Sequence, residues 1–262
     1  PTKSSAASDV YKRQMVNLLP LDEEERITSI LPIDGYDENQ FIFMATANGT
    51  VKKTAATQFS RPRSVGLRAI ELEEDDVLVG TAITDGNSDI MLFSTEGKAT
   101  RFNEGQVRAM GRTARGVRGI NLAVGQKLIS LIVPREGGRI LTVTENGYGK
   151  RTENAEFPAK GRGGKGVIAM STSERNGSLV GAVQVWDGDE MMLISNQGTA
   201  VRTRVDEVSL LGRNTQGVRV IRTRDGEALV SVSRIAEDDD AAEPAQPIVT
   251  LSLIHISEPT RR

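Results

Sequence analysis

Cysteine is absent from the 262 residues, which excludes disulfide frameworks, thiolate metal sites and cysteine nucleophiles. The chain has one histidine, His255, close to its end. Aromatic residues make up only 4%, too few for a surface that stacks on exposed bases. No apolar run approaches the roughly 18 residues of a membrane span, and no basic-then-apolar signal segment opens the chain.

Glycine and short runs of Val, Ile, Leu and Thr are abundant. With 26 glycines and 38% hydrophobic residues, the composition favours many short strands and tight turns over a helix bundle. The net charge of −2 is uneven: residues 41–235 hold 27 Lys/Arg and 21 Asp/Glu, and the flanks hold the other 6 basic and 14 acidic residues. A basic centre between acidic ends favours a polyanionic partner; an ordinary solvated surface is the alternative.

Three landmarks recur about every 50 residues. Hairpin turns are marked by glycines 48, 50 and 51 residues apart, at Gly49, Gly97, Gly147 and Gly198. The second landmark is a loop glycine, which recurs at steps of 50, 50 and 51 residues as Gly66, Gly116, Gly166 and Gly217. The third is the leucine that begins the strand after each loop: Leu78, Leu128, Leu179 and Leu229. Such a repeat, with about four strands per unit, is typical of a propeller-like ring whose units pack on their neighbours. The sequence therefore predicts an all-β, propeller-like fold of four complete blades plus part of one more, in an incomplete ring.

Basic residues keep step with this repeat. Four residues after each hairpin glycine the chain has Lys53, Arg101, Arg151 or Arg202. Two residues after three of the loop glycines come Arg68, Arg118 and Arg219; the remaining loop has Lys165 just before its glycine. Since equivalent repeat positions occupy equivalent places on every blade, we expect these cations to form a belt around the ring. The alternative, that they only solvate strand ends, predicts scattered charge of both signs.

The stretch from Arg108 to Ile120, RAMGRTARGVRGI, places four arginines among glycines and small residues. Glycine permits close approach and arginine forks onto phosphate or carboxylate oxygens, so this composition suits an anion-contacting loop. The related stretch Lys160 to Gly166, KGRGGKG, lacks the glycine at 159 and the Ser/Thr at 166 of a Walker loop. The acidic group from Asp85 to Glu96 has Ile90 where a calcium loop requires glycine. We predict no catalytic and no metal site.

Both ends of the chain differ from the repeat. Residues 1–14 and 251–262 are typical of translated adapter sequence, so we expect them to be non-native tails outside the fold. We expect residues 15–36 to form the end of a preceding blade, with a strand leading to Ile33, and residues 37–235 to form the four blades. Residues 236–250 are predicted to be an acidic disordered tail. Trp186 and the few phenylalanines are expected in the blade cores.

Many of these segments, among them MATANGTVKKT, VRAMGRTARGVRGI and VRTRVDEVSLLGRNTQGVRVI, closely resemble the C-terminal domain of the bacterial DNA gyrase A subunit. The likeness runs from about Met15 to the acidic segment. It implies a six-bladed β-pinwheel that bends duplex DNA around its rim. It also implies a cytoplasmic, nucleoid-associated parent enzyme, a type IIA topoisomerase that forms an A2B2 heterotetramer with the gyrase B subunit and introduces negative supercoils using ATP. ATP and Mg²⁺ would act elsewhere in that enzyme, so we expect no cofactor in this chain.

Two features depart from the family pattern. The family's wrapping motif, QRRGGKG, belongs to the first blade, and this chain is expected to begin after that blade. Lys160 to Gly166 matches five of its seven positions but lies in a later blade, so we interpret it as a degenerate counterpart that contacts DNA. The nucleophilic tyrosine of the cleavage domain is also missing, since Tyr36 and Tyr148 lie in expected turns.

The expected DNA contacts combine the belt with neighbouring loop cations. They are Lys52, Lys53, Arg63, Arg68, Arg101, Arg108, Arg112, Arg115, Arg118, Lys150, Arg151, Lys160, Arg162, Lys165, Arg202, Arg213 and Arg219. Binding through them would depend on phosphate charge and on duplex deformability. Three alternatives remain: the corresponding domain of the topoisomerase IV A subunit, a propeller for protein interaction, and a propeller enzyme, for which the chain has no usable His or Cys.

Overall fold

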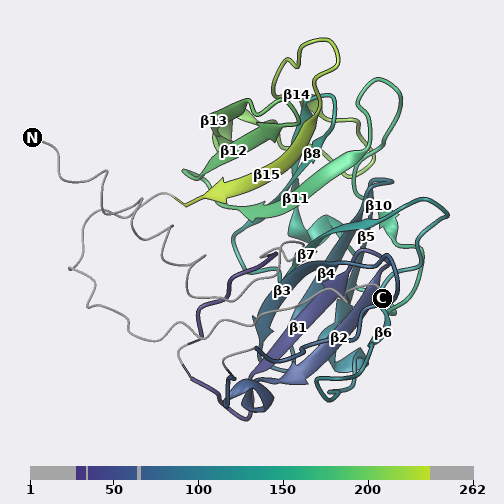
Figure 1. Cartoon of the computed structure of the whole chain (residues 1–262). Helices are drawn as coiled ribbons and strands as arrows, with labels where there is room; N and C mark the ends of the chain where they lie inside the picture. Colours follow the sequence, from purple (N-terminus) through teal and green to yellow (C-terminus); the bar gives the residue numbers. More distant parts are fainter. Residues whose placement is uncertain (1–27, 34, 64–65, 237–262) are drawn as a thin grey trace, which may run out of the picture.

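The structure, a computed structural model, describes residues 28–33, 35–63 and 66–236. They form four antiparallel sheets, one for each predicted unit (Figure 1). Among these residues, helix occurs only as 3-10 turns of three or four residues, none with the length or apolar character of a membrane span. The predicted all-β class is confirmed. Expectations for residues 1–27 and 237–262, which include both adapter-like ends and most of the acidic tail, fall outside the described residues.

Each sheet is built around a hairpin that turns at a predicted glycine. The first sheet contains β1 (Phe41–Thr46), β2 (Thr50–Ala55) and β3 (Leu78–Thr84), and the second β4 (Asp89–Ser94), β5 (Lys98–Asn103) and β7 (Leu128–Ile132). The third contains β8 (Arg139–Thr144), β9 (Tyr148–Glu153) and β11 (Leu179–Val185), and the fourth β12 (Glu190–Ser195), β13 (Ala200–Arg204) and β15 (Leu229–Ile235). The hairpin glycines have positive φ, from 76° at Gly97 to 82° at Gly49, which a side chain would strain.

A 3-10 turn follows the second strand of each hairpin. These turns are η1 (Ala56–Phe59), η2 (Glu104–Gln106), η3 (Asn154–Glu156) and η4 (Val205–Glu207). The chain then leaves its own sheet and crosses to the preceding one, where two residues of the loop pair with the sheet edge. These short strands are β6 (Val117–Arg118) on β2, β10 (Val167–Ile168) on β5 and β14 (Val218–Arg219) on β9.

Neighbouring units therefore exchange strands. The first three sheets have four strands each, in the orders β3-β1-β2-β6, β10-β5-β4-β7 and β11-β8-β9-β14. The fourth has three, β13-β12-β15, because no later unit within the described residues supplies a strand to β13. The prediction of four strands per blade is correct for the first three blades. Their fourth strand comes from the unit that follows in the sequence. The last blade has three strands within the described residues, so it is not the complete blade that we expected.

The strands after the loops line the inside of the assembly. β3, β7, β11 and β15 contact one another in succession, and each begins at the leucine predicted to open it. Figure 1 shows β11 and β15 side by side. The sheet orders then place β6, β10 and β14 at the opposite, outer edges of their blades.

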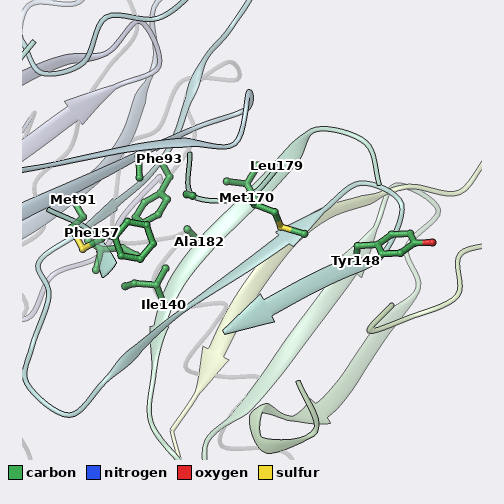
Figure 2. Close-up of a cluster of buried hydrophobic side chains, with 11 residues drawn as sticks. Met91, Phe93, Ile140, Tyr148, Phe157, Met170, Leu179 and Ala182 are labelled. Atoms are coloured by element: carbon green, nitrogen blue, oxygen red, sulfur yellow. The ribbon is translucent and has the colours of Figure 1, made fainter. Parts of the chain in front are cut away.

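The hydrophobic core lies between adjacent blades. One cluster joins Met91 and Phe93 of the second blade to Ile140 and Phe157 of the third (Figure 2). The Phe93 and Phe157 rings meet edge to face, with centroids 5.9 Å apart. Equivalent clusters join the first blade to the second and the third to the fourth. A single blade cannot bury its own faces, which is the physical reason for the repeat.

Two smaller expectations are corrected. Residues 28–33 form no strand; instead Ser29 shares a hydroxyl hydrogen bond of 2.8 Å with Thr81, and Ile33 packs against the first blade. Trp186 is not a core residue, because its ring is partly exposed and the Arg234 guanidinium lies 4.4 Å from the ring centroid.

Candidate nucleic-acid interface

Three loops cover the outer edge of the blades. These rim loops comprise residues 107–118, 157–168 and 208–219, and each runs along the outer strand of the preceding blade. Isolated parallel bridges join Lys53 to Ala109, Arg101 to Ala159 and Arg151 to Leu210 before the short strands begin. Residues 60–63 and 66–68 hold the corresponding repeat positions in the first unit.

The loop glycines recur because of this close approach. Gly116, Gly166 and Gly217 have positive φ values of 113°, 77° and 77°. A Cβ at these positions would lie 2.5, 2.4 and 2.6 Å from carbonyl oxygens of β2, β5 and β9. Only glycine fits against the strand in this conformation. The predicted role of glycine in close backbone approach is correct, but the partner that requires it is the neighbouring blade.

Each rim loop also binds the residues that directly follow the loop or segment of the preceding unit. Gly163 N donates to Gly119 O (2.8 Å), and Asn121 N donates to Gly164 O (2.9 Å). Ser171 N donates to Thr215 O at the next junction, at 3.1 Å. At the first junction, Glu71 N donates to Ala114 O (3.3 Å). The loops of successive units therefore form one continuous band, which we call the rim.

Eight of the predicted contacts lie exposed on the rim loops and the first-unit segment. They are Arg63, Arg68, Arg108, Arg115, Arg118, Lys160, Lys165 and Arg219. Within the described residues only one of them, Arg115, forms an ion pair, at 3.3 Å from Glu71, and both side chains of that pair are largely exposed. Cations that are exposed and mostly unpaired remain available to an external anion.

Three further loop arginines are half-buried, and two of them link loops. Arg162 donates from Nη1 to Arg118 O at 2.5 Å, and Arg213 donates from Nη1 to Ile168 O at 2.9 Å. Arg112 is the third. The guanidinium groups of Arg162 and Arg213 thus hold the band together, and each has other N–H groups besides the one used here.

The cations four residues after the hairpin glycines have a different role from the expected one. Lys53 donates to Glu104 O (3.0 Å), Arg101 to Asn154 O (3.2 Å), and Arg151 to Val208 O (2.8 Å). Each acceptor lies in or next to the 3-10 turn of the following unit. This set recurs because it fastens neighbouring blades together.

Carboxylates neutralise the same cations. Lys53 Nζ lies 3.4 Å from the fully buried Glu104, Arg101 pairs with Asp89 at 2.8 Å, and Arg151 pairs with Asp187 and Asp206 at 3.1 Å. The last member, Arg202, pairs with Glu190 and is exposed. The prediction that this set belongs to a free basic belt is therefore wrong for Lys53, Arg101 and Arg151, whose charges are already paired.

Lys52 and Lys150 cannot contact DNA in this structure, which corrects two further predicted contacts. Both side chains are fully buried, at 0% exposure. Their ammonium groups donate to backbone carbonyls of the neighbouring loops: Lys52 to Arg112 O (2.5 Å) and Lys150 to Gly212 O (2.7 Å). A buried ammonium requires such acceptors, because burial without them is costly.

One cationic group was missed in the sequence. Arg175 and Arg219 lie over the Tyr148 ring, 5.0 and 5.2 Å from its centroid, and both donate to the Tyr148 hydroxyl. These bonds, led by the one from Arg219, lower the pKa of the Tyr148 hydroxyl. Figure 2 shows this hydroxyl directed away from the other labelled side chains. Arg175 lies outside the basic positions that recur after the hairpin and loop glycines, so their period did not indicate it.

This arrangement defines a class: a strand-exchanged β-pinwheel with a cationic outer rim. The family described as "DNA gyrase C-terminal domain, beta-propeller" matches residues 40–85, 88–135, 138–185 and 189–236. These four segments cover most of the chain and coincide with the four blades. The chain belongs to the DNA gyrase A C-terminal domain family.

Relatives and solved structures agree with this assignment. The chain is similar to the DNA gyrase A subunit of Salmonella typhimurium, with 58% identity over 231 residues, 88% of this chain and 26% of that protein. The chain thus spans about a quarter of the length of such relatives. A solved DNA gyrase A C-terminal domain matches with a TM-score of 0.75 and 28% identity, over 85% of this chain and 74% of that one. The C-terminal domain of DNA topoisomerase IV matches with a TM-score of 0.79 and 27% identity, over 84% and 69%.

Proposed function

We propose that this chain binds duplex DNA along its rim without sequence preference and, as the C-terminal part of a DNA gyrase A subunit, contributes this surface to chiral wrapping by the parent enzyme. The observation that carries this proposal is the rim itself, a continuous band of loops with eight exposed cations. Loops that hydrogen-bond to one another keep these charges on a single surface. Backbone phosphates are the matching partner, because they lie at regular intervals along a duplex.

The energetics favour binding by phosphate contacts over base reading. Smoothly bending 20 to 30 base pairs through 40 to 90° costs about 1 to 6 kcal/mol. Each neutralised phosphate releases condensed counterion, so several contacts along the rim offset that cost. Positive side chains on loops at an outer edge do not enter a groove as a recognition helix does. Affinity should therefore follow salt concentration and duplex flexibility more than base sequence.

The parent enzyme in this proposal is a type IIA topoisomerase that uses ATP to introduce negative supercoils. This chain supplies the wrapping surface, and the cleavage chemistry, ATP and Mg²⁺ act in other parts of an A2B2 assembly with the gyrase B subunit. The site of action is the cytoplasmic nucleoid. The support is the 58% identity to a gyrase A subunit and the family match over all four blades.

A topoisomerase IV domain is the second candidate. The backbone favours it slightly, since the TM-score with that domain is 0.79 against 0.75 for the gyrase domain. The sequence favours gyrase, because the 58% identity to a gyrase A subunit far exceeds the 27% identity to the topoisomerase IV domain. The rim of this chain can be tested without choosing between the two candidates.

The test is a salt titration of duplex binding by the full chain. Contacts from about half of the exposed rim cations give a slope of log affinity against log salt of about −4. Replacing Arg115 and Arg118 together by alanine should reduce that slope by about two. The matched control replaces Lys127 and Arg135, two exposed cations outside the rim loops, by alanine and removes the same charge. A flat salt response, or equal losses in both double variants, would overturn the proposal.

A further inference from the structure

Two buried lysines stand at the same repeat position beneath the rim. Lys52 and Lys150 each lie three residues after a hairpin glycine, in the outer strands of the first and third blades. Both side chains are fully buried. Neither forms an ion pair within the described residues, so backbone carbonyls provide the compensation that burial of a charge requires. The other two blades have Thr100 and Val201 at this position.

The ammonium of Lys150 lies in a cage formed by one rim loop. It donates to Gly212 O at 2.7 Å and to Arg213 O at 2.6 Å. The carbonyl and the hydroxyl of Thr215 lie at 3.2 Å. These acceptors surround the segment that carries Arg213. An ammonium has three donors and no acceptor, so it can bind several of these oxygens at once.

Lys52 repeats this arrangement two blades away. Its Nζ donates to Ala69 O at 2.6 Å and to Arg112 O at 2.5 Å. The two acceptors belong to different units, so one ammonium joins the first-unit segment to the next rim loop. The recurrence in a separate blade indicates a common role. In both cases one of the acceptors is the backbone carbonyl of a rim-loop arginine, Arg112 or Arg213.

We propose that Lys52 and Lys150 are positioning residues for DNA binding, which act from inside the blades by holding the backbone of the rim loops. This inference rests on the proposed function of the rim. The lysines touch no DNA; they fix the loops so that the exposed cations need little ordering when the duplex binds. Preorganised loops bind more tightly because less conformational entropy is lost on binding.

The charge on these lysines is sensitive to pH. Burial lowers the pKa of Lys150 to about 8; nearby Glu156 opposes this shift and Arg213 adds to it. Burial and Arg112 likewise lower the pKa of Lys52 to about 8. A lowered pKa means that the closed loop holds the neutral amine at less cost than the ammonium, so raising the pH above 8 should not loosen the loops.

The experiment compares the full wild-type chain with Lys150→Thr, which copies the residue that the second blade carries as Thr100. Hydrogen exchange without DNA should speed up in residues 209–217 and stay unchanged in the rim loop at 157–168. DNA affinity should fall about three- to tenfold. Because the chain has no cysteine, Lys150→Cys can be aminoethylated selectively while unfolded, and the restored ammonium should recover both exchange and affinity after refolding.

Unchanged exchange in residues 209–217 of a folded Lys150→Thr chain would overturn the inference. So would failure of aminoethylated Lys150→Cys to recover slow exchange. Should Lys150→Thr not fold, Lys52→Thr gives the same test at residues 110–114. Hydrogen exchange is measured without DNA, so it tests the hold on the rim loop independently of DNA binding. If exchange is faster in Lys150→Thr but the wild-type chain does not bind DNA, the hold on the loop is supported and the proposed function is contradicted.

Discussion

Replacing Glu104 by alanine tests whether the cations of the outer strands hold the blades together. Its carboxylate is fully buried and accepts hydrogen bonds from the Thr84 hydroxyl (2.8 Å) and from Gly86 N and Ser88 N (both 2.9 Å). It also compensates the charge of Lys53, which is 6% exposed. Alanine would leave these three donors without their acceptor and the buried Lys53 ammonium without its counter-charge, although the backbone carbonyl of residue 104 would still accept from that ammonium. Removing one partner of a buried ion pair costs about 3 to 5 kcal/mol.

The assay is equilibrium urea unfolding of the full chain, with thermal unfolding as a second measure. At about 2 to 4 °C per kcal/mol for a domain of this size, the melting temperature should fall by roughly 10 °C. Glu71→Ala is the matched control, because Glu71 pairs with Arg115 on the surface and its loss should cost less than about 1 kcal/mol. Adding Lys53→Met should recover part of the loss in Glu104→Ala, since no unpaired ammonium remains. A loss below about 1 kcal/mol would refute the structural role of Lys53 and Glu104.

Two further predictions concern wrapping and protonation. The chain contains no QRRGGKG motif, so it should bind nicked plasmid yet trap little writhe when the plasmid is ligated; strongly shifted topoisomers on a gel would contradict this. The pKa of Lys150 falls from 10.5 to about 8 on folding, so the unfolded chain binds more protons between these values. The unfolding free energy of wild type relative to Lys150→Met should therefore rise from pH 8 to 10.5, by at most about 3 kcal/mol; urea melts that show a fall would refute it.

The repeat could be predicted because it has strict geometric causes. Gly49 and its equivalents take a positive φ that favours glycine, and Leu78 and its equivalents open the strands on the inner side. Both requirements apply in every blade, so both leave a period in the sequence. The pairing of β6, β10 and β14 with the preceding blade could not be predicted, because two-residue strands are too short to show an alternating hydrophobic pattern.

The cations could be found from the sequence, but their roles could not. Lys53 and Arg118 are both periodic, yet one is paired inside the fold and the other is exposed. The difference depends on carboxylates such as Glu104 and Asp187, which come from different positions of their repeats. One signal was present: the position of Lys52 and Lys150 is occupied by Thr100 and Val201 in the other blades. A position that accepts valine faces the interior more readily than a solvated rim.

If the rim loops lie against DNA, bound duplex should shield their lysines from acetylation, which footprinting measures residue by residue. Lys160 and Lys165 lie exposed on one rim loop, whereas Lys127 is exposed elsewhere, and Lys52 and Lys150 are buried. The chain is acetylated briefly with and without duplex DNA at low salt, and each lysine is quantified by mass spectrometry. We expect DNA to protect Lys160 and Lys165 severalfold and to leave Lys127 unchanged. Equal reactivity of Lys160 and Lys165 with and without bound DNA would show that this rim loop does not lie against the duplex.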